Sequence, residues 1–238
     1  MTMQITKVIR CRGIGEDPTG HDTMLEGVTD LIPGIETVEL PWSAQYGPVG
    51  RAGLTGDDYL HALQQGVALA LAELDRGPAV LFGYSGGAQL AHMTAAHGHP
   101  NLQGVGFIAD PAMPKGVGPN YGVTGADPEP ITVPKHWVWN PLDIICQCPT
   151  DSPIRDIADV SVSFSAQNFP GWTWNMLDDL RFGRWQVMGK YLFISPVDQW
   201  KRWSAAIAGA TGYLNGTEHV AAYRGARQRE LADWVKSL

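Results

Sequence analysis

The segment Gly83-Tyr84-Ser85-Gly86-Gly87 matches the pattern Gly-x-Ser-x-Gly. An apolar run over residues 79–82 precedes it, and a helix-like segment over residues 86–97 follows it. A sharp turn between a buried strand and a helix holds the serine hydroxyl out at the carboxyl edge of a sheet. A plain strand-to-helix turn and a glycine-rich phosphate turn are the alternatives, and the missing Gly-Lys-Ser/Thr excludes a P-loop. The pattern predicts that Ser85 is a nucleophile, with the N-terminus of the following helix favouring negative charge beside it.

A serine nucleophile needs a general base, and the order of the histidines along the chain favours His219. In hydrolases that use this turn, the triad residues follow the order serine, acid, histidine. His219 lies where a loop over residues 215–218 meets a predicted final helix over residues 219–238. The other histidines after Ser85 lie on or just beyond its own helix, or at the start of a strand: His92, His97, His99 and His136. We expect His219 to be the base, the alternative being a neighbour of a helix cap without a chemical role.

The acid that orients such a histidine should follow a later strand of the sheet. Two aspartates satisfy this condition: Asp110 follows a predicted strand over residues 103–108, and Asp143 follows one over residues 135–139. Asp143 leaves one strand between nucleophile and acid, whereas Asp110 stands before a proline and reads equally well as a turn cap. We therefore favour Asp143, with Asp110 as the alternative and Asp198 as a more distant one.

The negative oxygen of an acyl-transfer intermediate needs two hydrogen-bond donors. The backbone N–H of Gly86, the residue after the nucleophile, is the expected first donor. The loop after the first predicted strand, residues 12–16, should supply the second, and we choose the backbone N–H of Ile14. The alternative is that Gly13 and Gly15 only allow the chain to turn.

The elements that position these residues follow an alternating rhythm over the first 140 residues. Strands are predicted over residues 4–11, 35–40, 79–82, 103–108 and 135–139, and helices over residues 21–31, 57–75 and 86–97, with Thr55 as a cap. This rhythm predicts an α/β fold with a central parallel sheet and helices on both faces. We expect one domain over residues 1–238, with residues from about 150 to 212 forming an inserted helical lobe between the acid and His219.

Composition excludes several classes of protein. The 238 residues carry a net charge of −7 and no basic run, which argues against nucleic-acid binding. No stretch approaches ~18 consecutive apolar residues, so no transmembrane segment is expected, and the N-terminus lacks the apolar core of a signal peptide. Three cysteines exclude a disulfide scaffold; we expect buried free thiols, with a Cys11–Cys146 bridge as the alternative. No side-chain cluster predicts a metal, and a serine mechanism needs no cofactor.

The predicted lobe is rich in aromatic residues. Five of the nine tryptophans fall between positions 172 and 203. Either these side chains form the lobe's own core, or some of them line an apolar groove over Ser85, as in clefts that accept lipid chains. Trp172 and Trp174 are the first candidates for contact with a substrate.

The motifs together resemble the cutinase-like branch of the α/β-hydrolases, and within it the lysin B esterases of phages that infect mycobacteria. Arg12-Gly13-Ile14-Gly15 resembles the family's H-G-T-G loop, and Gly83-Tyr84-Ser85-Gly86-Gly87-Ala88 resembles G-Y-S-Q-G-A. Asp143-Ile144-Ile145-Cys146 is similar to the cutinase segment D-x-V-C that carries the acid. Seventy-six positions separate Asp143 from His219, and a long helical insertion there is typical of lysin B. Gly86 stands where the family has Gln, and Arg12 where it has His.

The resemblance implies a serine esterase that hydrolyses the ester between mycolic acids and arabinogalactan during host lysis. It implies a protein made in the host cytoplasm without a signal peptide, which acts on a lipid ester of the bacterial envelope after the membrane is breached. The alternatives are a general cutinase or lipid esterase, an acyltransferase with the same triad, and a non-catalytic relative that binds a lipid or a partner. The motifs make no prediction of an oligomeric state.

Overall fold

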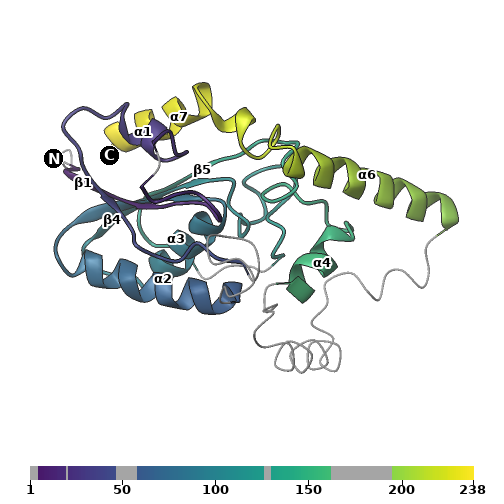
Figure 1. Ribbon diagram of the computed structural model, residues 1–238, viewed down its shortest axis with the longest axis horizontal. Helices are drawn as coiled ribbons and strands as arrows, with labels where there is room; N and C mark the ends of the chain where they lie inside the picture. The colour runs from purple at the N-terminus through teal and green to yellow at the C-terminus, as the bar shows by residue number, and fades with distance from the viewer. Residues whose placement is uncertain (1–4, 20, 47–57, 126–129, 162–194) are drawn as a thin grey trace.

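The computed structural model describes residues 5–19, 21–46, 58–125, 130–161 and 195–238 (Figure 1). Its strands are β1 (Lys7–Cys11), β2 (Glu36–Glu39), β3 (Ala79–Tyr84), β4 (Leu102–Ile108) and β5 (Lys135–Val138). Its helices are α1 (Glu26–Thr29), α2 (Tyr59–Leu74), α3 (Gly86–Ala96), α4 (Ile154–Ser161), α6 (Pro196–Leu214) and α7 (Ala226–Lys236), with a 3₁₀ turn, η3 (Ala221–Tyr223), before α7.

The described strands form one parallel sheet in the order β2-β1-β3-β4-β5. Parallel neighbours need crossover connections, and α2 and α3 supply the ones that lead into and out of β3. The direction of the strand order reverses between β1 and β3. In such sheets a crevice for ligands opens beyond the carboxyl ends of the strands at this reversal. The loop after β1 and the turn that carries Ser85 both lie there.

Helices cover both faces of the sheet, as the sequence predicts (Figure 1). Strands buried on both sides need apolar side chains in both directions, and all six residues of β3 are buried. One apolar cluster joins the sheet to α2 and α3, and the other joins it to α1 and α7. The first cluster includes Ile9, Leu63, Leu81 and Leu90, and the second includes Val8, Val28, Val80 and Leu231.

The predicted final helix over residues 219–238 is wrong at its start. His219 lies on a turn, η3 follows it, and α7 begins only at Ala226. The interruption has a local cause, because Gly225 adopts a φ of 70°, a left-handed backbone that glycine accepts readily. His219 therefore lies outside regular helix, on a segment that other parts of the chain must hold in place.

Two other predicted helices differ at their ends. The helix expected over residues 21–31 is regular only as the short α1. The helix expected from residue 57 begins at Tyr59, and its cap is Asp58, whose side chain accepts the backbone N–H of His61 at 2.8 Å. Thr55, the predicted cap, lies outside the described residues.

The part of the inserted lobe that the structure describes is helical. It consists of α4 and α6, and α6 extends beyond the α/β body (Figure 1). The predicted groove residues Trp172 and Trp174 lie outside the described residues, and the division into one domain with a lobe stays a prediction. None of the described helices combines the length and the apolar character needed to cross a membrane.

All three cysteines are buried free thiols, so the alternative of a Cys11–Cys146 bridge is wrong. Burial disfavours the charged thiolate and raises the pKa of all three groups, that of Cys148 to about 11. The thiolate is the reactive form of cysteine, so each thiol is protected both by the protein around it and by its raised pKa.

We therefore expect native protein to react with far less than one equivalent of Ellman's reagent at about pH 8, where an exposed cysteine reacts readily. The same protein in guanidinium chloride should release three equivalents, one for each cysteine. Rapid labelling of a thiol in the native state, located by peptide mass spectrometry, would contradict the buried positions described here.

Candidate active site

Ser85 occupies a strained turn between β3 and α3. Its backbone has φ 53° and ψ −122°, which is unfavourable for a residue with a side chain. The turn is held by its glycines: a β-carbon at Gly87 would overlap the carbonyl oxygens of Cys11 and Arg12, and one at Gly83 would overlap the backbone of Ala88. The backbone N–H of Ser85 donates to the Ile108 carbonyl of β4 at 2.9 Å. The predicted strand-turn-helix geometry around Ser85 is thus present.

The three side chains selected from the sequence form a continuous chain of contacts. His219 Nε2 lies 2.8 Å from Ser85 Oγ, and His219 Nδ1 lies 2.9 Å from Asp143 Oδ2. Asp143 is completely buried, His219 is 5% exposed and Ser85 is 9% exposed. This arrangement can transfer a proton from the serine hydroxyl to the imidazole while the carboxylate stabilises the resulting imidazolium.

Three donors besides His219 contact the carboxylate of Asp143, one of them the Cys146 thiol at 3.7 Å from Oδ2. The backbone N–H of Ile145 donates to Oδ1 at 3.0 Å, and the Tyr223 hydroxyl donates to Oδ2 at 2.8 Å. The Tyr223 hydroxyl itself accepts the backbone N–H of Asn140 at 3.0 Å. Burial, followed by the nearby Cys146 and Asp143, raises the pKa of Tyr223, so the phenol stays protonated and remains a donor.

Sequence reasoning did not identify Tyr223 as part of the site. One available signal was the hydroxyl of a tyrosine four positions beyond the predicted base, because a buried tyrosine hydroxyl needs a partner. In the structure Tyr223 is completely buried and completes the contacts of Asp143.

Tyrosines also hold the base. The Tyr84 hydroxyl donates to the backbone carbonyl of His219 at 2.7 Å. This bond links the residue before Ser85 to the histidine that contacts the Ser85 hydroxyl. The imidazole lies beside two tyrosine rings, with centroids 5.5 Å from that of Tyr84 and 4.8 Å from that of Tyr213. Burial raises the pKa of both tyrosines. The turn that carries His219 is therefore fixed by neutral, bulky groups.

The loop after β1 presents its backbone to the same place. Among the described residues, no acceptor is present for the backbone N–H of Ile14 or for that of Gly86. A β-carbon at Gly86 would lie 2.7 Å from the side chain of Ile14, so the absence of a side chain at Gly86 lets the loop approach the turn. Both N–H groups are therefore available, and their predicted role as oxyanion donors stays a prediction.

Arg12 and Glu16 make this loop rigid. The guanidinium of Arg12 donates to the carbonyls of Glu16, Leu40 and Trp42. The carboxylate of Glu16 accepts the backbone N–H of Gly13 at 2.8 Å. Arg12, where the resembled family has histidine, thus has a structural role that links the loop to the segment after β2.

The alternative residues lie elsewhere. Asp110 contacts Nδ1 of His92 and Nε1 of Trp137, each at 3.0 Å, and accepts the backbone N–H of Ala112 at 2.8 Å, as a turn cap does. Asp198 is exposed near the start of α6 and contacts Ser195. His136 pairs with Glu230 of α7. Asp143 is therefore the aspartate that contacts His219.

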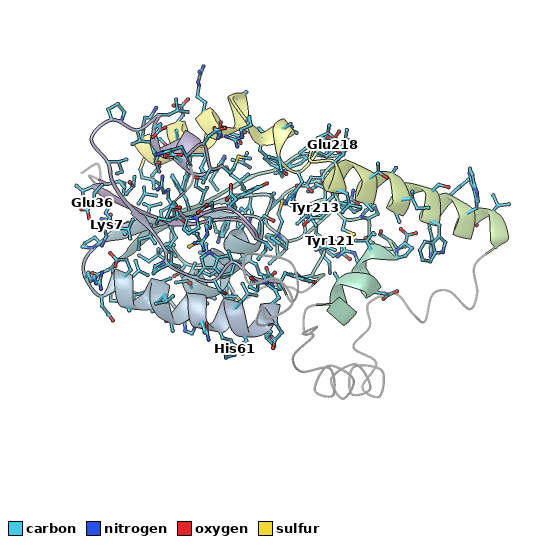
Figure 2. The ribbon with its side chains drawn as sticks, viewed as in Figure 1. Lys7, Glu36, His61, Tyr121, Tyr213 and Glu218 are labelled. Carbon is cyan, nitrogen blue, oxygen red and sulfur yellow. The ribbon has the colours of Figure 1, made fainter. Side chains whose placement is uncertain are left out.

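An apolar pocket of about 370 Å³ opens beside Ser85. Its walls come from the loop after β1, the start of α2 and α3, the segment after Asp143, α4 and the end of α6. Besides Ser85 and Gly86, the pocket is lined by Ile14, Tyr46, Tyr59, Gln89, Pro111, Val123, Thr124, Ile144, Ile145, Ile154, Ala158, Ala210, Tyr213 and Leu214. A polar hollow of about 500 Å³ lies at the amino ends of β1 and β2, near Lys7 and Glu36. Figure 2 shows these two residues at one end of the molecule, on the other side of the α/β body from Tyr213.

The described residues contain no group of three or more His, Cys, Asp or Glu side chains arranged to hold a metal ion. Ser85, His219 and Asp143 are the polar side chains that the structure brings into one chain of contacts at this place. The parallel sheet, the strained serine turn and the chain order serine, aspartate, histidine are those of the α/β-hydrolase fold. The predicted fold class is confirmed.

No family model and no curated protein matches the chain. Solved structures that are similar to it include a cutinase-like protein and an acetylxylan esterase. The cutinase-like protein is from Cryptococcus sp., with 15% identity, 68% of this chain and 96% of that chain covered, and a TM-score of 0.43. The acetylxylan esterase has 15% sequence identity and a TM-score of 0.44. The match covers 75% of this chain and 100% of that chain. Likeness at this level says nothing about substrate.

The contact between Tyr223 and Asp143 is directly testable with Tyr223→Phe. This change removes one donor from a buried carboxylate and leaves the Asn140 N–H without its acceptor, at a cost of about 1–3 kcal/mol. We expect the rate at which a fluorophosphonate labels Ser85 to fall roughly ten-fold, which corresponds to about 1.4 kcal/mol of lost stabilisation. Tyr121→Phe is the matched control, because the ring of Tyr121 lies under Arg155, away from Asp143. An unchanged labelling rate in Tyr223→Phe would limit Tyr223 to a role in stability.

Proposed function

We propose that the protein is a serine esterase. The observation that carries this proposal is the unbroken contact from Ser85 Oγ through His219 to Asp143 at the switch point of the sheet. His219 would accept the hydroxyl proton as Ser85 attacks the ester carbonyl, and the negative oxygen of the tetrahedral intermediate would face the N–H groups of Gly86 and Ile14. Collapse would release the alcohol with the proton from His219 and leave an acyl-enzyme, which water then hydrolyses.

The pocket supports a substrate with an apolar acyl group. Its lining is dominated by aliphatic and aromatic side chains, and it begins at Ser85 itself. Each methylene that leaves water for such a surface contributes roughly 0.8 kcal/mol, so an alkyl chain would be bound along its length. A lipid ester is therefore the substrate class that we propose.

Within this class we propose the ester between mycolic acids and arabinogalactan, cleaved at the bacterial envelope. This narrower choice rests on the resemblance of the serine turn and of the Asp143 segment to lysin B, together with the long connection between Asp143 and His219. A general cutinase or lipid esterase would use the same triad and pocket, and an acyltransferase would replace the attacking water by an alcohol.

Substitution of the triad tests the mechanism. We expect Ser85→Ala to lower kcat by at least about a thousand-fold, His219→Ala nearly as much and Asp143→Asn somewhat less. Because the three residues act as one unit, the double change at Ser85 and His219 should add almost nothing. The readouts are hydrolysis of p-nitrophenyl esters and release of free mycolic acids from purified mycolyl-arabinogalactan.

The exposed residues Ser237 and His61 provide alanine controls of the same residue types. Retention of more than about a tenth of wild-type kcat by Ser85→Ala would remove the nucleophile assignment. Cleavage of p-nitrophenyl esters without release of mycolic acids would keep the esterase and discard the mycolyl substrate.

Occupation of the pocket by the acyl chain predicts a preference for longer chains. We expect kcat/KM for p-nitrophenyl octanoate to exceed that for acetate by about ten-fold or more, because added methylenes are buried in the transition state. Ala210→Phe places a large ring in the pocket from α6 and should remove most of this preference while leaving acetate within about three-fold of wild type. Ala208→Phe, on the exposed side of α6, is the control. Equal losses on both substrates would indicate that the pocket does not hold the acyl chain.

A further inference from the structure

Helix α6 carries large apolar side chains on its exposed surface. Trp200 is 72% exposed, Trp203 46%, Ile207 63% and Leu214 81%. Their spacing of three, four and seven residues places them on one face of the helix. We call these four residues the α6 stripe. At a rise of 1.5 Å per residue, the stripe is about 21 Å long. Ordinary protein surfaces expose apolar side chains mostly one at a time, so a continuous row of this length is unusual.

Another side of α6 makes contacts with the described residues, while Val197 near its start is 63% exposed outside the stripe. Ala206 is 2% exposed, and a β-carbon at Gly209 would lie 3.1 Å from Ile144, so this side of the helix packs onto the segment after Asp143. Arg202 pairs with Asp151 at 2.8 Å. Lys201 lies on the side away from the stripe. The helix is thus amphipathic, with tryptophan and aliphatic residues on one face and charged residues on another, as in helices that lie at lipid-water interfaces.

The stripe is continuous with the pocket beside Ser85. Leu214 belongs to both, and its neighbours Ala210 and Tyr213 also line the pocket. Whatever covers the stripe therefore lies at the entrance to the pocket. Figure 1 shows that α6 extends past the α/β body, so its far end can approach a flat surface. Tryptophan suits such a surface, because its ring prefers the boundary between hydrocarbon and water.

We propose that the α6 stripe binds the surface of a lipid aggregate and delivers acyl chains from it to the pocket. The proposal rests on the esterase function proposed above and extends it to substrates presented at an interface. An acyl chain could then move from the lipid phase along the stripe to Ser85 without crossing water. The stripe contains no charged residue, and the chain carries a net charge of −7, so binding should depend on apolar contact and should not be strengthened by anionic lipid.

Flotation with vesicles tests the binding step. We expect wild-type protein to float with phosphatidylcholine vesicles, with little change on adding salt or on replacing part of the lipid by phosphatidylglycerol. The double change Trp200→Asp/Ile207→Asp should lower the bound fraction at least ten-fold. Ala205→Asp, an exposed position on the charged side of α6, is the matched control and should bind like wild type. Absence of wild-type protein from the vesicle fraction overturns the proposal without reference to any variant.

Two ester assays separate this proposal from the proposed function. The double variant should hydrolyse soluble p-nitrophenyl butyrate within about two-fold of wild type, and p-nitrophenyl laurate dispersed in vesicles at least ten-fold more slowly. A wild-type protein that cleaves neither ester refutes the esterase. A wild-type protein that cleaves the soluble ester but ignores vesicles refutes only the lipid-binding stripe.

The other occupants of the stripe have distinct signatures. If a second copy of the chain covers it, light scattering shows a wild-type dimer that the double variant converts to a monomer, and vesicles stay unbound. If the stripe packs against another part of the same chain, the aspartates lower the unfolding midpoint, and vesicles again stay unbound. Either result overturns the proposal.

Discussion

The close approach of α3 to the end of β1 is the constraint on which the candidate site depends. It requires Gly87, whose β-carbon would overlap the carbonyl oxygens of Cys11 and Arg12. Ser85, at the same turn, has a positive φ of 53°, which costs about 1–3 kcal/mol and which the packing around β3 must outweigh. In return, the N-terminus of α3 and the loop after β1 meet at one point. The N–H groups of Gly86 and Ile14 both remain without a described acceptor there, in a place where negative charge would be stabilised.

The other half of the site is held by hydroxyls. The Tyr84 hydroxyl donates to the backbone carbonyl of His219, and the Tyr223 hydroxyl donates to the carboxylate of Asp143. His219 and Asp143 are thus each held by a phenol, and burial raises the pKa of both phenols. A phenol donates a hydrogen bond to the buried carboxylate of Asp143 without placing a second charge beside it. Tyr84 is also the residue before Ser85. The strand that presents the nucleophile thereby positions the base, although 135 residues separate Tyr84 from His219 along the chain.

Local patterns were enough to predict the sheet, Ser85 and, by chain order, Asp143 and His219 as residues that should meet. They were not enough for the contacts that hold these residues, because Tyr223 and Asp143 are 80 positions apart and nothing in the local sequence links them. The start of the last helix was misplaced, although Gly225 marked the break. Asp110 and Asp143 both follow strands, and only the packing of His92 and Trp137 around Asp110 separates their environments. Tertiary contacts decided the surroundings of Asp110 and Asp143, whereas the break before α7 has a local cause at Gly225.

The segment that follows Asp143 also lines the pocket. This double role limits how the shape of the pocket can change. Ile144 and Ile145 line the pocket and directly follow Asp143, whose carboxylate accepts the N–H of Ile145. Gly209 of α6 packs on Ile144, so a larger residue at Gly209 would press on the side chain of Ile144, the residue after Asp143. Side chains that point from α6 into the pocket, such as Ala210, can vary in size without moving this segment. Substitution on the pocket face of α6 would therefore change the size of the pocket, whereas the position of α6 depends on its contact with Ile144, the neighbour of Asp143.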